Sequence, residues 1–170
     1  VLETESGRVS APNIAKPNVT TPTKVNFVRS LLRDNFLGAG SVLFRRSLVE
    51  QFSNPFDFRF KTIGEYPLWL KMAIRTEVRF VDEVVAVWRT HSKNTGKMHE
   101  LLGKQELVVF FSELLGLDEF EKYRNEIKVC IVKRKYDLAA LAYDKERYDI
   151  FFKNIFEVLI SPYSNSKLRA

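Results

Sequence analysis

Apolar residues recur at helical spacing through most of residues 97–160, and this pattern limits the fold of the chain more than any other. Residues three or four positions apart lie on one face of a helix, so each apolar stripe predicts an amphipathic helix. Pro162 follows the last stripe and predicts its end. We therefore expect a helical tail. The stripes comprise Leu107, Phe110, Phe111, Leu114 and Leu115, then Leu117, Phe120, Tyr123, Ile127 and Ile131, then Leu138, Leu141 and Ala142, and last Tyr148, Phe151, Phe152, Ile155, Phe156 and Leu159.

The bulk composition excludes several classes of protein. The 170 residues include one cysteine, Cys130, so an intrachain disulfide framework is excluded and a reducing, cytoplasmic compartment is expected. No run of apolar residues approaches the ~18 that a membrane span needs. Most of the net charge of +6 lies in residues 1–96, where we expect any anionic ligand to bind. A mildly basic surface without a ligand explains the same charge.

The sequence of the first part of the chain predicts a mixture of loop, helix and short strands. Residues 1–23 hold three prolines and many small polar residues, which indicate loop or extended chain and suggest an internal segment of a longer protein. Residues 24–34 show helical spacing. The stretch SVLFRR and the valine-rich residues 78–91 predict short strands.

The stretch GEYPLWLKMA, residues 64–73, places an acid before a nearly apolar run. Proline is favoured in the first turn of a helix, where its missing N–H would have no partner, so Pro67 predicts a helix start. Apolar residues cover most of this helix, which is expected to be buried. Glu65 precedes its N-terminus, where the helix dipole favours a negative charge. The carboxylate is explained either by that dipole alone or by a catalytic role.

Chemistry-bearing motifs are sparse. The sequence has no glycine-rich phosphate loop, no paired-cysteine metal site and no nucleophile elbow. Arg89 and His91 lie two positions apart near the end of a predicted strand, so their side chains are expected on one face. A structural role explains a lone histidine equally well. Glu65 and this pair are the candidates for chemistry.

Four stretches in order resemble the second half of family 2 glycosyltransferases: NFLGAGSVLFRRSLVEQF, FDFRF, GEYPLWLKMA and EVVAVWRTH. The resemblance covers about residues 25–96. It implies an α/β fold class, a mixed α+β fragment forming the C-terminal part of a GT-A fold. Residues 1–96 would be the acceptor-side part of the catalytic domain, and residues 97–170 a helical C-terminal extension.

The resemblance implies roles for individual residues. Glu65 matches the general base that takes a proton from the acceptor hydroxyl. Arg89 and His91 match residues that bind the donor diphosphate, and His91 is also a candidate metal ligand. For Trp69, the alternative role is a place in the hydrophobic core. For Gly38 and Gly40, the alternative explanation is simple turn geometry. The implied acceptor-binding residues are Asn35, Gly38, Gly40, Tyr66 and Trp69.

The implied activity is inverting transfer of a sugar from a nucleotide-sugar to a hydroxyl of a glycan or glycolipid, as in polysaccharide or lipopolysaccharide synthesis. The resemblance also implies a divalent metal, Mg or Mn. The chain departs from the family pattern at Gly64-Glu65, where the family has two acids, and at Pro67, where it has a third. It has no Asp-x-Asp and no nucleotide-binding half, so we expect a piece of a longer enzyme that is inactive alone.

A different class explains the same sequence: a non-catalytic, basic, helix-rich module that binds an anionic partner or a membrane surface. Lys133, Arg134 and Lys135 form a basic run that is either a solvated face or a contact with the inner face of the membrane. We expect no nucleic-acid partner. Self-association of the fragment is expected where the missing half would leave an edge uncovered.

Overall fold

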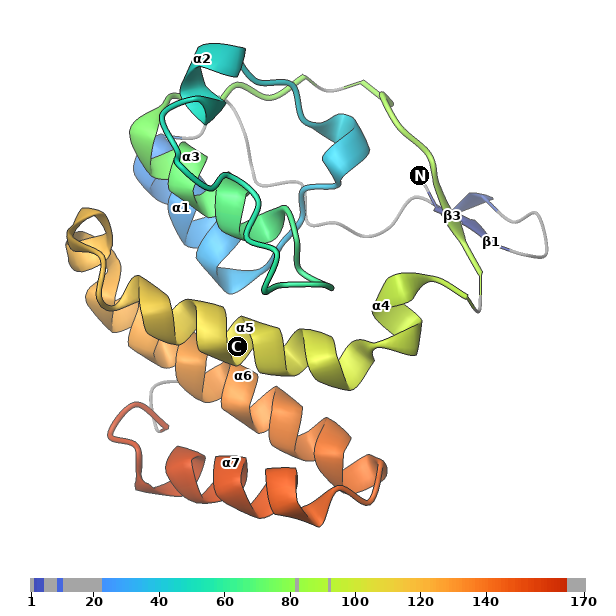
Figure 1. Ribbon diagram of the computed structural model, residues 1–170, viewed down its shortest axis with the longest axis vertical. Helices are drawn as coiled ribbons and strands as arrows, with labels where there is room; N and C mark the ends of the chain where they lie inside the picture. The colour runs from blue at the N-terminus through green and yellow to red at the C-terminus, as the bar shows by residue number, and fades with distance from the viewer. Residues whose placement is uncertain (1, 5–8, 11–22, 82, 92, 165–170) are drawn as a thin grey trace. The chain divides into compact units, whose positions relative to one another are not determined.

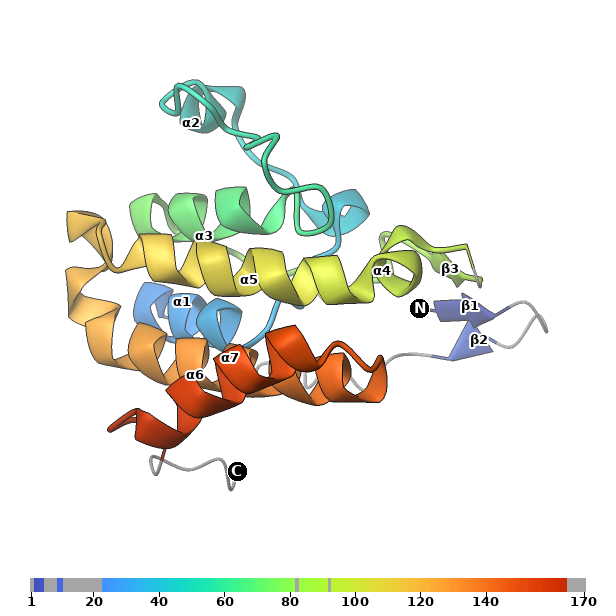
Figure 2. The ribbon, with the colours of Figure 1, turned by 60° about the horizontal axis from the view of Figure 1, so that its bottom comes forward.

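The computed structural model describes residues 2–4, 9–10, 23–81, 83–91 and 93–164. It divides the chain into two compact units (Figures 1 and 2). Unit 1 comprises residues 1–59 and 64–98, and unit 2 comprises residues 60–63 and 99–170. Most of the loop predicted over residues 1–23 lies outside the described residues. No described helix is both long and apolar enough to cross a membrane.

Unit 1 is built around two packed helices, α1 and α3 (Figure 1). The Thr23 hydroxyl caps α1 by accepting a hydrogen bond from the Asn26 N–H at 3.4 Å. One face of α1 is buried, and nearly all of α3 is buried, as its apolar composition predicts. The described elements of unit 1 are β1 (Leu2–Thr4), β2 (Val9–Ser10), α1 (Lys24–Arg33), the 3-10 helix η1 (Ala39–Ser41), α2 (Arg46–Val49), α3 (Tyr66–Arg75), β3 (Trp88–Thr90) and α4 (Thr95–Met98).

The predicted helices of unit 1 are confirmed. The helix expected over residues 24–34 is α1. The helix expected to start at Pro67 is α3, which begins one residue earlier and has its proline in the first turn. The Tyr66 hydroxyl donates a hydrogen bond to the backbone carbonyl of Leu31, and this bond joins α3 to α1.

The expected α/β fold class, and with it the GT-A fragment, is wrong. The structure is predominantly helical. The described strands contain only two or three residues each and pair in the order β2-β1-β3. Of the predicted strand over residues 78–91, only Trp88–Thr90 pairs, in parallel with Leu2–Thr4. A strand needs a hydrogen-bonded neighbour, and the described residues offer none to the preceding valines.

Unit 2 is helical, as predicted for the tail (Figure 2). Helix α6 packs against both α5 and α7. Phe110, Phe111, Phe120 and Ile127 are among the buried side chains of unit 2. The last helix ends at Ile160, two residues before Pro162. The elements of unit 2 are α5 (Glu100–Leu114), the 3-10 helix η2 (Asp118–Tyr123), α6 (Arg124–Asp144) and α7 (Tyr148–Ile160).

A buried carboxylate joins residues 60–63 to α5. Glu106 is 6% exposed and accepts hydrogen bonds from the backbone N–H groups of Lys61 at 2.7 Å, Thr62 at 2.9 Å and Ile63 at 3.3 Å. The Thr62 hydroxyl donates a fourth, at 2.5 Å. Gly103 lies one turn before Glu106, and a Cβ there would be 3.0 Å from Thr62 Oγ1. The missing side chain of Gly103 therefore lets Thr62 approach α5 closely.

The basic run on α6 is only partly available to an anionic surface. Lys133 is exposed. The Arg134 guanidinium lies 4.0 Å from the centre of the Phe111 ring, and Lys135 forms an ion pair with Glu157. Two of the three cations therefore help to pack unit 2.

Candidate functional site

Glu65 lies directly before the buried helix α3. It is the N-cap residue, and its backbone carbonyl accepts a hydrogen bond from the Trp69 N–H at 3.0 Å. Its side chain is half-buried and does not cap the helix. Among the described residues, the Glu65 carboxylate has no hydrogen-bond or ion-pair partner. A carboxylate without such a partner can accept a hydrogen bond from a ligand.

The two aromatic residues after Glu65 are buried. Tyr66 is 2% exposed, and its hydroxyl already binds the Leu31 carbonyl, so its predicted contact with an acceptor stays a prediction. Trp69 is 5% exposed, and its ring centre lies 5.8 Å from that of Phe44. The buried Trp69 Nε1–H finds no acceptor among the described residues. An unsatisfied buried donor costs about 1–3 kcal/mol, so this N–H is a spare donor inside unit 1.

The predicted acceptor loop is exposed and turn-like. The Asn35 side-chain oxygen accepts a hydrogen bond from the Leu37 N–H at 3.3 Å. The Gly38 carbonyl accepts two, from the N–H and the hydroxyl of Ser41, at 2.9 and 2.8 Å. A Cβ on Gly40 would lie 3.7 Å from the Cβ of Ala86, an ordinary contact. Close approach within the protein therefore does not require glycine at position 40.

Arg89 and His91 lie at the end of β3. The Arg89 backbone pairs with Glu3, and the Arg89 side chain lies outside what is described. His91 is half-buried. Its backbone N–H donates a hydrogen bond to the side-chain oxygen of Asn94 at 2.5 Å, in the turn that leads into α4. The described residues contain no group of three or more His, Cys, Asp or Glu side chains able to hold a metal ion. The described residues therefore form no metal site of this kind around His91.

Unit 1 contains all the residues predicted for the site, but the described contacts join only some of the segments that carry them. The Phe44–Trp69 ring contact places the loop after Gly40 beside α3, and the approach of Gly40 to Ala86 places it beside the segment before β3. No described hydrogen bond or ion pair joins Glu65 to His91. The arrangement gives a carboxylate just before a buried aromatic helix, and no other ionisable side chain among the described residues pairs with it.

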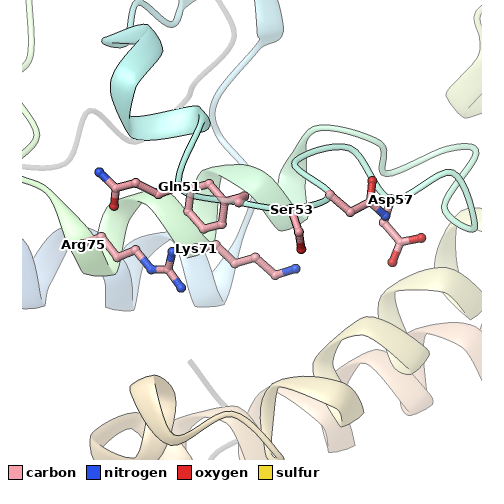
Figure 3. A pocket seen from close by; sticks show the side chains of 7 residues that line it. Gln51, Ser53, Asp57, Lys71 and Arg75 are labelled. Atoms are coloured by element: carbon pink, nitrogen blue, oxygen red, sulfur yellow. The ribbon is translucent and has the colours of Figure 1, made fainter.

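A polar pocket of about 270 Å³ lies on another part of unit 1, between α3 and the segment that follows α2 (Figure 3). Lys71 and Arg75, one helical turn apart, project from α3 into it. The other lining residues are Gln51, Phe52, Ser53, Asn54 and Asp57.

Contacts with neighbours hold two of the charges of this pocket in place. The Arg75 guanidinium lies 4.3 Å from the centre of the Phe52 ring, a cation–π contact. The Asp57 carboxylate binds Arg59, with its Oδ2 2.6 Å from the nearer guanidinium nitrogen. The hydrogen bond from Arg59 holds the pKa of Asp57 below its ordinary value. The positive charge of Lys71 also lowers the pKa of Asp57, to a smaller extent than Arg59 does.

Sequence reasoning missed this pocket and the buried Glu106. The four-residue spacing of Lys71 and Arg75 on an otherwise apolar helix marked a polar edge of α3. Nothing in the sequence indicated that residues 51–57 would face that edge, because their position depends on tertiary packing.

Comparisons of the chain with protein families, curated proteins and solved structures give no match.

Proposed function

We propose that this chain forms the acceptor side of an inverting, sugar-nucleotide-dependent glycosyltransferase in which Glu65 is the general base. The observation that carries the proposal is the half-buried Glu65 carboxylate at the start of a buried aromatic helix, which has no partner among the described residues. A general base must be charged and within hydrogen-bond reach of the proton it removes. The order of the sequence stretches around Glu65, which resembles family 2 glycosyltransferases, supports the same role.

The chemistry needs one carboxylate on the acceptor side. Glu65 accepts the hydroxyl proton as the acceptor oxygen attacks the anomeric carbon, and the bond from that carbon to the nucleoside diphosphate breaks. A single displacement inverts the anomeric configuration. The buried Trp69 Nε1–H, without a partner among the described residues, is a donor that an ordered water inside unit 1 would satisfy.

The acceptor in this proposal is a hydroxyl of a glycan or glycolipid. The protein works in the cytoplasm, at the inner face of the membrane when the acceptor is lipid-linked. Dependence on Mg or Mn stays a prediction, and no step is assigned to a metal, because the described residues bring no group of ligands together.

Exposed apolar side chains in unit 1 support a further segment that holds the donor. Leu43 is 99% exposed, Phe58 88% and Val84 72%. Where such side chains form a contiguous patch, that patch is a surface on which another protein segment can pack. Arg89 and His91 would meet the donor diphosphate from the acceptor side.

The proposal is tested by transfer of labelled sugars from nucleotide-sugars to a panel of glycan and lipid-linked acceptors. The assay uses the protein as its cell produces it, and NMR reads the anomeric configuration of the product. Transfer with inversion is expected. Transfer with retention would exclude the single displacement, and the absence of transfer to every acceptor would leave the non-catalytic module as the better account.

A further inference from the structure

We propose that the outer face of helix α7 pairs with the same face of a second copy of this chain. The inference is independent of the proposed glycosyltransferase activity, because α7 belongs to unit 2 and Glu65 to unit 1. It rests on the exposure of an apolar face, on the spacing of its side chains, on its area and on the charge around it.

Helix α7 is the outer helix of unit 2 and packs against α6 (Figure 1). The residues that it buries are Asn154 and Val158. On the opposite side of α7, five large apolar side chains are exposed, and Tyr143 at the end of α6 extends their surface, since its ring centre lies 6.0 Å from that of Tyr148. A contiguous exposed apolar surface marks an interaction site. This surface, the α7 face, comprises Tyr143, Tyr148, Phe152, Phe156, Leu159 and Ile160, which are 49–72% exposed.

The spacing of the α7 face suits pairing with a copy of itself. Four of its side chains recur at intervals of four residues and form one ridge along the helix: Tyr148, Phe152, Phe156 and Ile160. Ridges of this kind on two helices interlock at a crossing angle of about −50°, the commonest helix packing in globular proteins. The centre of the ridge lies between Phe152 and Phe156. A two-fold axis through this centre therefore brings Phe152 of one copy against Phe156 of the second copy.

The area of the α7 face is sufficient for a dimer. An aromatic side chain presents roughly 150–250 Å², so four aromatic and two aliphatic side chains at these exposures offer roughly 600 Å² in each copy. Burial in both copies removes roughly 1,200 Å² from water, which is the lower end of the range for specific interfaces. Aromatic side chains are also enriched at the centre of such interfaces. The size of the face predicts a reversible dimer.

The charge around the α7 face favours a protein partner over an anionic membrane. Residues 144–160 contain four acids and three bases, a net charge of −1. A helix that lies on a membrane surface is instead rich in lysine and arginine on its polar side. One acid and one base, Asp149 and Lys153, are exposed beside the ridge. Two copies of the face therefore meet without an excess of like charge.

Sedimentation equilibrium of the protein over a range of concentrations tests the proposal. We expect the average mass to rise with concentration from that of one chain to that of two. Phe152→Glu places a charge at the centre of the interface and should weaken the dimer by about a hundredfold or more. The matched control is Phe58→Glu, the same change at a phenylalanine of unit 1 that is 88% exposed, which should leave the dimer unchanged. Circular dichroism checks that every variant keeps its helices.

A mixture of two variants tests the symmetry of the contact. Phe152→Glu and Phe156→Lys should each be monomeric, but their mixture should form a dimer, because opposite charges then meet across the two-fold axis. Three results overturn the proposal: the mass of one chain at every concentration, a dimer that persists in Phe152→Glu, or a mixture that stays monomeric. Binding of a monomeric protein to phosphatidylglycerol vesicles, lost in Phe152→Glu, also overturns it and identifies a membrane surface as the partner of the α7 face.

Discussion

The Glu106 carboxylate accepts a hydrogen bond of 2.5 Å from the Thr62 hydroxyl, across 44 positions of sequence. Three backbone N–H groups of residues 61–63 bind the same carboxylate. A buried carboxylate is tolerated when hydrogen bonds replace its hydration, and here four donors do so. This set of bonds, together with the edge-to-face contact of Phe60 with Phe110 at 5.9 Å, attaches residues 60–63 to the helices of unit 2.

Replacing Glu106 with glutamine should destabilise the protein by about 2–3 kcal/mol. The amide keeps the shape of the side chain but replaces one acceptor oxygen with a donor that faces backbone N–H groups. Urea denaturation measures the loss. Glu100→Gln is the matched control, because Glu100 is exposed in the first turn of the same helix and should cost about 0.5 kcal/mol. Equal losses in the two variants would contradict the structural role of Glu106.

Acid should weaken this attachment. Burial alone would raise the pKa of Glu106, but the hydrogen bonds from Thr62, Lys61 and Ile63 outweigh it and hold the pKa below the ordinary value of 4.5. The stabilisation is therefore fully present above pH 4.5 and is lost as the pH falls through the lowered pKa. Melting curves from pH 7 to pH 3 should show the stability difference between the wild type and Glu106→Gln narrowing at the acid end. A difference that is constant with pH would contradict the shift.

The turn between α6 and α7 offers a stabilising substitution. Glu146 has a φ of 58°, in the left-handed region that favours glycine. The Arg147 N–H binds the Ala142 carbonyl at 2.8 Å, and the Glu146 N–H binds the Tyr143 carbonyl at 3.0 Å, which is the Schellman pattern of a helix end. Glu146→Gly should raise the free energy of unfolding by about 1 kcal/mol. Lys145→Gly, at a φ of −97°, should give no such gain.

The Tyr66 hydroxyl should be needed for stability in unit 1. Tyr66→Phe removes its bond to the Leu31 carbonyl and leaves a buried acceptor with one partner fewer, at a cost of about 1–2 kcal/mol. Tyr143→Phe is the control, because Tyr143 is 57% exposed. Thermal denaturation of both variants tests the difference, and an unchanged melting temperature in Tyr66→Phe would contradict it.

Local patterns predicted the helices of this chain and failed for its strands. Helical spacing and Pro67 need only neighbours in sequence, and α1, α3 and the helical tail follow from them. The valines before Trp88 have strand composition, but a strand forms only beside a partner strand, which lies elsewhere in a sequence. Exposed Val85 and Val87 show the result: strand-forming residues without a strand.

The candidate site also has one part that local sequence predicts and another that depends on tertiary packing. The helix after Glu65 places that residue at its start, so the sequence was enough to predict its position. The polar pocket needs residues 51–57 to face Lys71 and Arg75, and no local pattern encodes that approach. Likewise, the sequence alone does not reveal that Lys135 pairs with Glu157 instead of facing an anionic surface.

The most direct test of Glu65 as the general base is the steady-state kinetics of sugar transfer by Glu65→Gln. The substitution keeps the size of the side chain but removes its ability to take a proton. The proposed role predicts a fall in kcat of about 10²–10⁴-fold with little change in KM for the acceptor. Glu77→Gln, an exposed acid just beyond the end of α3, should leave both constants unchanged. Wild-type kcat in Glu65→Gln would contradict the account.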